Sequence, residues 1–185
     1  TGADIKHADL QANLNKGLSK RIDGKGGFKA LPGDSDSHGT HVSGIIGATY
    51  NNKVGISGIA AGSGNNAEDV MGIDSSIWGS FFTTDDLVSS LLKAEEQGAK
   101  VVNLSLGGEG RDRILEDVIE DIYKKGVTVV AAAGNESTDD VVNPSDIGEV
   151  ISVCSTTRAN TLSDFSNFGL AKDISAPGSN IKSSV

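Results

Sequence analysis

Two amphipathic helix patterns, at residues 83–98 and 111–126, are each followed directly by a short and strongly apolar run. These runs, at 100–106 and 127–133, are too apolar for strands that have one face in water, and VISVCS at 150–155 is a third of the same kind. Such runs are typical of parallel strands buried in a sheet. The alternation predicts a doubly wound α/β fold of three layers, with a mostly parallel sheet and helices on both faces.

Each helix pattern carries an apolar stripe and a stop signal. Gly98 and Gly126 are placed to end the two helices, and Lys124 and Lys125 suit the negative end of the second one. The stripes consist of Leu87, Val88, Leu91 and Leu92 in the first helix and of Ile114, Leu115, Val118, Ile119 and Ile122 in the second.

Size and charge limit the class of protein. A chain of 185 residues with 37% hydrophobic residues can form one domain with a sizeable core. Its formal net charge of -9 repels phosphate backbones, so we expect no nucleic-acid partner. No apolar stretch reaches the roughly 18 residues of a membrane span. The single Cys154 lies in an apolar run and is expected to be buried, without a disulfide.

Two small-residue turns follow the predicted strands, SLGG at 105–108 and GNES at 134–137. In a doubly wound sheet, ligands bind beyond the carboxyl ends of the strands, so these turns are candidates for a binding site. A glycine-rich stretch at 23–37 has little periodicity and is predicted to be a surface loop that leads into a helix at His38.

The HGTH motif places His38 at the start of a predicted helix, with an apolar face behind it. A neutral imidazole there can accept a proton from a nucleophile. His41, one turn further on, is expected to pack or hydrogen-bond inside. The pair does not have the HExxH spacing of a zinc site and has no cysteine cluster beside it, which disfavours a zinc centre.

Five motifs in register resemble the subtilisin-like serine proteases. DSHGTHVSGIIGA with His38 is similar to the family's histidine motif, and NNKVGISGIAA is similar to the calcium loop that follows it. VVNLSLGG, VVAAAGNES and the segment from FSNFG to SAPG then follow in the family's order. Together these motifs cover nearly the whole chain.

The resemblance implies a role for two residues in acyl transfer through an Asp/His/Ser triad. His38 resembles the general base, which takes the proton of the serine and hands it to the leaving amine. Asn135 resembles the side-chain donor of the oxyanion hole, which stabilises the charge that develops on the scissile carbonyl oxygen.

The resemblance also implies a cleft for an extended polypeptide, whose main chain pairs with both edges. Because the residues of the S1 pocket carry no charge, we expect a large apolar side chain at P1. The predicted substrate-binding residues are Ser105, Leu106 and Gly107 on one edge, Ala132, Ala133 and Gly134 on the pocket floor, and Gly79, Ser80 and Phe81 on the opposite edge.

Calcium is the one cofactor that the resemblance implies, and no organic cofactor is expected. The implied ligands are the side chains of Asp9 and Asn52 and the main-chain carbonyls of Val54 and Ile56, which are oxygens of the kind that this hard cation prefers. The segment between His38 and the NN pair is one residue longer than in subtilisins, so a plain tight turn is the alternative.

Two members of the triad are not found in these residues. The family's Asp stands directly before [ST]G, and the chain opens with Thr1 and Gly2. The family's Ser stands in GTSMA after the APG segment. We therefore expect residues 1–185 to be a partial catalytic domain, truncated at both ends and inactive when expressed alone. The remaining serines near the end are expected to be structural, namely Ser175, Ser179, Ser183 and Ser184.

The sequence thus predicts a serine endopeptidase of which this chain supplies only the histidine of the triad. A catalytically inactive pseudo-protease that binds peptides is the alternative, and a nucleotide-binding domain has little support because no glycine motif opens a helix after a strand. We expect a monomer that is secreted or on the surface of a bacterial cell, with a possible propeptide outside these residues.

Overall fold

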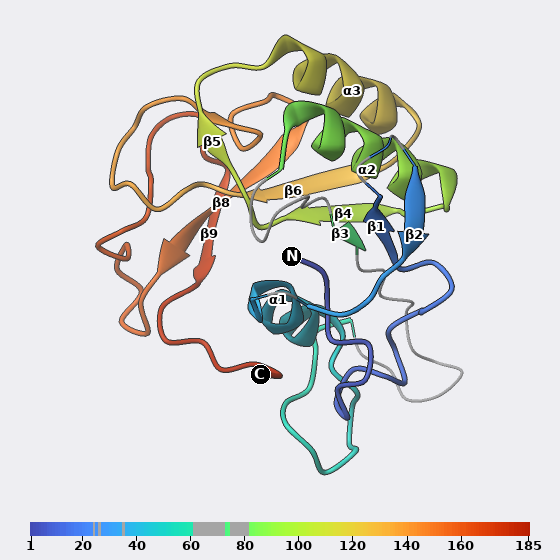
Figure 1. Ribbon diagram of the computed structural model, residues 1–185. Helices are drawn as coiled ribbons and strands as arrows, with labels where there is room; N and C mark the ends of the chain where they lie inside the picture. Colours follow the sequence, from blue (N-terminus) through green and yellow to red (C-terminus); the bar gives the residue numbers. More distant parts are fainter. Residues whose placement is uncertain (24, 26, 35, 61–72, 75–81) are drawn as a thin grey trace. The chain divides into compact units, whose positions relative to one another are not determined.

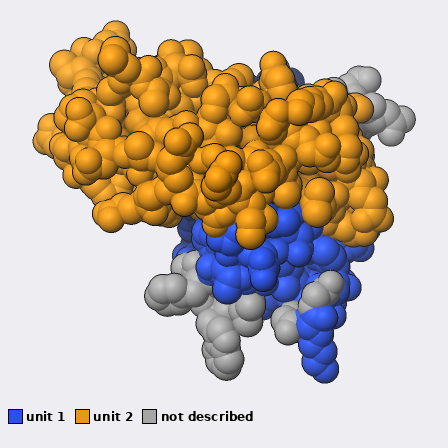
Figure 2. All heavy atoms as spheres, turned by 90° about the horizontal axis from the view of Figure 1, so that it is seen from above, with its two compact units in different colours: residues 1–90, 182–185 blue, residues 91–181 orange. Residues whose placement is uncertain are grey.

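The computed structural model describes residues 1–185 except 24, 26, 35, 61–72 and 75–81 (Figure 1). The chain divides into two compact units, residues 1–90 with 182–185 and residues 91–181 (Figure 2). The division falls inside helix α2 (Thr84–Glu96). In the described residues no helix has the length and apolar character needed to cross a membrane.

The first unit contains helix α1 (His38–Gly47) and a small sheet of order β2-β1-β3. Strand β1 (Lys20–Ile22) pairs antiparallel with β2 (Phe28–Ala30) and parallel with β3 (Ile73–Asp74). The surface loop predicted at 23–37 is therefore only partly a loop, since β2 lies within it. The residues of β2 show no periodic pattern of their own, so the sequence did not predict this strand. It forms by pairing with β1.

The second unit is built on a parallel sheet of order β4-β6-β8-β9. Its strands are β4 (Val101–Leu104), β6 (Thr128–Ala132), β8 (Val150–Thr156) and β9 (Ile174–Pro177). Helix α3 (Arg113–Lys124) connects β4 to β6 and lies against β6 (Figure 1). A separate antiparallel pair joins β5 (Gly108–Glu109) to β7 (Val142–Asn143). The predicted α/β architecture with a parallel sheet is confirmed.

The expected burial of the strands holds for one face of this sheet. Val129, Ala131 and Val150 are buried on the face that carries Leu104 and Ser152. On the other face Val101 is 62% exposed and Ile174 is 54% exposed. Uniformly apolar strands therefore do not mean burial on both sides in the described residues.

The amphipathic helices form where their periodicity predicts them. In α3 the buried positions are Leu115, Ile119 and Ile122, and Asp112 caps the first turn by accepting hydrogen bonds from two backbone N–H groups. Two stripe residues are exceptions: Leu92 is 41% exposed and Ile114 is 59% exposed. The apolar stripes predicted from the sequence therefore include residues that lie outside the buried faces of these helices.

Candidate active site

His38 is the first residue of α1 and is exposed. The first turn of a helix leaves backbone N–H groups without partners inside the helix. In α1 the N–H groups of His38, Gly39 and Thr40 each have a partner outside the helix. The N–H of His38 donates to Asp36 Oδ1 at 2.9 Å, and that of His41 donates to the carbonyl of Ser37 at 2.9 Å. The N–H groups of Gly39 and Thr40 donate to side chains from two further segments.

Asp34 holds the third residue of this helix. Its Oδ2 accepts from the backbone N–H of Thr40 at 2.7 Å and from the hydroxyl of Thr40 at 2.5 Å. Burial opposes ionisation of Asp34, but the hydrogen bonds from Thr40 and from the Asp36 N–H outweigh it and lower the pKa of the carboxyl. An anion is also favoured at the positive end of the helix.

The opening residues of the chain lie against the same turn. Thr1 Oγ1 accepts the N–H of Gly39 at 2.9 Å, and Gly2 forms a β-bridge with Asp34. A Cβ atom on Gly39 would lie 1.7 Å from the carbonyl oxygen of Gly2. Only glycine at position 39 therefore allows this segment to approach the residue next to His38.

The predicted substrate-binding segments of the second unit lie side by side. Strand β4 pairs with β6 so that Leu104 is opposite Ala131, which places Ser105 and Ala132 at adjacent carboxyl ends of the parallel sheet. Ser105 Oγ accepts a hydrogen bond from Asn103 at 2.9 Å. Ala133 is 2% exposed and donates its N–H to Val153 of β8 at 3.0 Å. The segments at 105–107 and 132–134, predicted as one edge and the floor of the substrate cleft, thus follow adjacent strands.

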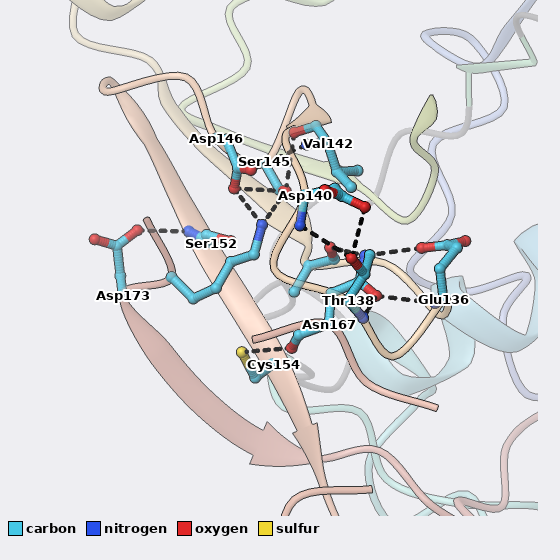
Figure 3. A network of polar contacts seen from close by, with 12 residues as sticks. Glu136, Thr138, Asp140, Val142, Ser145, Asp146, Ser152, Cys154, Asn167 and Asp173 are labelled. Atoms are coloured by element: carbon cyan, nitrogen blue, oxygen red, sulfur yellow. Dashed lines mark hydrogen bonds and ion pairs between the residues drawn. The ribbon is translucent and has the colours of Figure 1, made fainter. Parts of the chain in front are cut away.

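A two-stranded ribbon lies behind Gly107. A Cβ atom on Gly107 would lie 3.1 Å from the carbonyl oxygen of Asn143 in β7. The turn after β7 is held by a buried ion pair between Lys172 and Asp146, whose side chains are 4% and 7% exposed, and Asp146 also accepts the N–H of Val142 at 3.0 Å. This ion pair is among the contacts in Figure 3. The segment at 105–107 therefore lies against a ribbon whose turn is held by an ion pair and a hydrogen bond.

Asn135 is exposed in the turn that leaves β6, and its backbone N–H donates to Glu136 Oε2 at 2.8 Å. The preceding Gly134 has φ of +110°, a conformation that L side chains rarely adopt. The completely buried Asn167 lies beside this turn and bonds to several of its groups (Figure 3). His38 and Asn135 belong to different units.

The residues predicted to bind calcium meet around Asp9 in the first unit. Asp9 is completely buried. Its Oδ1 accepts from Asn52 Nδ2 at 2.8 Å, and its Oδ2 accepts from the Ile56 N–H and from the Ser184 hydroxyl, each at 2.9 Å. Asn52 Oδ1 accepts the N–H of Val54 at 2.9 Å. A hydrogen-bond network around Asp9 therefore holds the loop at residues 52–56.

This arrangement does not fit a cation as it stands. Both oxygens of Asp9 already accept hydrogen bonds from protein groups, and Asn52 presents its nitrogen rather than its oxygen to Asp9. Burial of Asp9 opposes ionisation, but the hydrogen bonds from Ile56, Asn52 and Ser184 outweigh it and lower the pKa of the carboxyl. A charged Asp9 is thus stabilised by protein donors alone.

The other predicted residues either lie outside the described residues or make structural contacts. Gly79, Ser80 and Phe81 lie outside the described residues. Ser183 donates to the carbonyl of His41 at 2.5 Å, so with Ser184 it anchors the chain against the first unit. In the part of the chain that the structure describes, no three His, Cys, Asp or Glu side chains lie close enough together to hold a metal ion.

Sequence reasoning missed three residues that hold the segments described above, one in the first unit and two in the second. Asp34 and Asn167 are polar residues in segments without periodicity, and Lys172 precedes a short strand. Asp34 offered a weak signal, because an acidic residue shortly before a helix is a frequent capping residue. Asn167 stood within the FSNFG motif, but nothing local connects it to a turn more than 25 residues earlier.

Comparisons with known proteins agree on one family. The family model described as "Subtilase family" matches residues 1–185. The thermophilic serine proteinase of Bacillus sp. (strain AK1) is 36% identical over 188 residues, which cover 100% of this chain and 44% of that protein. The major intracellular serine protease of Bacillus subtilis (strain 168) is 34% identical and is covered to 58%, with 100% of this chain matched.

A solved structure supports the same fold. The chain matches the crystal structure of a cold adapted subtilisin-like serine proteinase with a TM-score of 0.82 and 29% sequence identity. The match covers 100% of this chain and 62% of the other. The chain thus spans about half the length of the relatives that it matches.

Proposed function

Because the chain belongs to the subtilase family, we propose that it is most of the catalytic domain of a serine endopeptidase and that it supplies the general base and one oxyanion donor. In the full-length protease a serine attacks the scissile carbonyl while His38 takes its proton. An aspartate orients His38, and His38 then protonates the leaving amine. We place this aspartate directly before Thr1 and the serine after Val185.

The observation that carries this proposal is the environment of His38. The N–H groups of His38, Gly39 and Thr40 all have partners, so the backbone at the start of the helix is held in place. The hydrogen bond between Thr1 and Gly39, which holds Thr1 beside the turn of His38, supports the proposed place of the aspartate directly before Thr1. A carboxylate at that position would be suited to accept a hydrogen bond from the N–H of the ring.

Asn135 and the two small-residue segments complete the proposal. They lie at the carboxyl ends of adjacent parallel strands, where ligands bind in sheets of this kind. A peptide in extended conformation pairs with the edge at 105–107, and the floor at 132–134 leaves room for a large apolar P1 side chain. Removing one such oxyanion donor costs on the order of 100-fold to 1,000-fold in kcat.

Labelling of the full-length protease by a fluorophosphonate tests the mechanism. We expect covalent labelling and its loss in His38→Ala, whereas the matched control His7→Gln should keep it. Failure of the parent protein to be labelled would contradict the proposal. If the unlabelled protein still binds peptides, the pseudo-protease interpretation replaces it.

We also propose that residues 1–185 expressed alone are inactive and loosely packed. The exposed apolar face of the sheet, which includes Val101 and Ile174, supports this proposal. Peptide hydrolysis by the isolated chain, or a cooperative thermal unfolding transition, would count against it.

Calcium binding stays a prediction, and it requires the Asn52 amide to turn its oxygen toward Asp9. Calorimetric titration of calcium into chelator-treated protein is the test, with Asp9→Asn as the control. Binding that Asp9→Asn abolishes would support the predicted site. Absence of binding would support closure of the loop by hydrogen bonds alone.

Export and a monomeric state are further proposals. One of the relatives is named an intracellular protease, so membership of the family leaves the compartment open. Detection of the protein in culture medium rather than in cells would support export, and its mass in solution gives the oligomeric state.

A further inference from the structure

We propose that Asn167 is a positioning residue that holds the turn of Asn135 in the geometry needed for oxyanion binding. The proposal rests on the role of Asn135 described above. Asn167 belongs to the FSNFG segment, to which the mechanism assigns no other role. Its side chain is completely buried, so each of its polar atoms needs a partner within the protein.

The Asn167 amide uses its full hydrogen-bonding capacity on this turn. Its Oδ1 accepts the backbone N–H groups of Glu136 at 2.9 Å and Thr138 at 3.2 Å. Its Nδ2 donates to the carbonyl of Ala133 at 3.0 Å and to Glu136 Oε2 at 2.8 Å. Two acceptor and two donor positions are what an asparagine side chain offers. All of these partners lie within three residues of Asn135 in the chain. Figure 3 shows Asn167 with Glu136 and Thr138 beside it.

Glu136 extends the network to Asn135 itself. The same Oε2 that accepts from Asn167 also accepts the backbone N–H of Asn135 at 2.8 Å. Asn135 is therefore linked to the buried amide through one carboxylate oxygen. Because Asn135 is exposed, this backbone contact and those of its neighbours are what restrain it.

Backbone contacts join the same two segments. The N–H of Asn167 donates to the carbonyl of Gly134 at 3.2 Å, and the N–H of Ser137 donates to Phe165 at 3.0 Å. A Cβ atom on Gly134 would lie 2.2 Å from Asn167 Nδ2, so glycine is needed for the close approach. The side-chain amide of Asn167 thus adds to two backbone hydrogen bonds that already join residues 165–167 to the turn at 134–137.

Neither a carboxylate nor an apolar side chain of similar size can replace this amide. An aspartate has no N–H to donate and would place a second negative charge beside Glu136. A leucine would leave the N–H groups of Glu136 and Thr138 without their acceptor. An oxyanion donor is effective only when it is fixed before the charge develops, and a displacement of about 1 Å can cost on the order of 100-fold in rate.

A double-mutant cycle in the full-length protease tests the proposal. With a chromogenic peptide substrate, we expect Asn167→Ala to lower kcat by about 10-fold to 100-fold while KM changes by less than about threefold. In the Asn135→Ala background, the same substitution should lower kcat by less than about twofold, because the donor that it positions is already gone.

Ser163→Ala is the matched control. Ser163 is 2% exposed and its hydroxyl bonds to Ser155 and Ser179, away from the turn of Asn135. We expect this variant to lower the melting temperature without a comparable loss of kcat. Asn167→Ala with kcat within twofold of the parent, or with an equal loss in both backgrounds, would overturn the proposal.

A second variant keeps the test valid where Asn167→Ala fails to fold. Glu136 is exposed, so Glu136→Ala removes the carboxylate that links Asn167 Nδ2 to the Asn135 N–H and leaves the bonds of Asn167 to the backbone in place. We expect a fall in kcat of about threefold to fivefold that vanishes in the Asn135→Ala background. An additive effect would contradict the proposal. A parent protein without peptidase activity would instead refute the proposed function.

Discussion

The turn that carries His38 and the turn that carries Asn135 are both exposed, and each is held by a polar side-chain partner. This partner comes from the loop directly before the helix in the first case and from a distant segment in the second. For His38 this partner is the carboxylate of Asp34, which only accepts hydrogen bonds and so binds the N–H and hydroxyl of Thr40. For Asn135 it is the amide of Asn167, which donates and accepts. The carboxylate matches a helix start, where unpaired N–H groups point one way, and the amide matches an irregular turn with both kinds of group.

The largest effect is expected from a single methyl group beside His38. Gly39→Ala should lower the free energy of unfolding by about 3 kcal/mol, because the new Cβ would lie 1.7 Å from a backbone oxygen that cannot move alone. Peptidase activity should fall at least 100-fold. Chemical denaturation and initial rates measure both effects. Gly148→Ala, with no atom within 4 Å of the new Cβ, is the control and should stay within about 0.5 kcal/mol of the parent.

The equivalent change at the other turn should be milder. Gly134→Ala combines a φ of +110° with a contact to the side chain of Asn167 rather than to a backbone atom, so we expect a loss of about 1–3 kcal/mol and roughly a tenfold lower kcat. Urea denaturation and steady-state kinetics are the measurements. If Gly134→Ala lost more stability than Gly39→Ala, the expectation that the turn of His38 is the more sensitive of the two would be wrong.

Removal of the carboxylate at the start of α1 should cost less again. Asp34→Ala leaves the N–H and hydroxyl of Thr40 without their acceptor, and a lost helix cap costs about 0.5–2 kcal/mol. We expect a lower melting temperature and a lower kcat/KM, since the helix begins at His38. Asp36→Ala removes the acceptor of the His38 N–H and serves as the comparison. No change in either quantity would show that the helix start does not depend on Asp34.

The smallest expected effect is a difference between the two turns in how stability depends on pH. The folded protein lowers the pKa of Asp34, so the stability that its ionised form contributes is present above the unfolded value near 3.9 and is lost as pH falls through the lower folded value. Asp34→Asn should therefore show a shallower loss of stability below about pH 4 than the parent. Asn167 carries no titrating group and should add nothing to this slope. Denaturation curves between pH 3 and 6 measure both, and identical slopes would contradict the prediction.

Much of the fold follows from local patterns in the sequence. The helices α1, α2 and α3 and the strands β4, β6 and β8 lie where periodicity and apolar runs predict them. The site segments at 105–107 and 132–134 were predicted from the motifs, and their adjacency follows from parallel strand order. The strand β2 and the exposed face at Val101 were not predicted, because they depend on what pairs with or covers a segment.

The sequence by itself determined the family, the parallel sheet and the identity of His38 and Asn135 as the residues of interest. Only the tertiary structure decided what holds them. Asn167 reaches a turn 31 residues earlier in the chain at Glu136, and Thr1 reaches Gly39 across 38 residues. Periodicity reports which face of a segment is apolar, whereas a hydrogen bond between distant polar groups depends on how the segments pack. A buried polar side chain is recognisable as a positioning residue only when its partners are known.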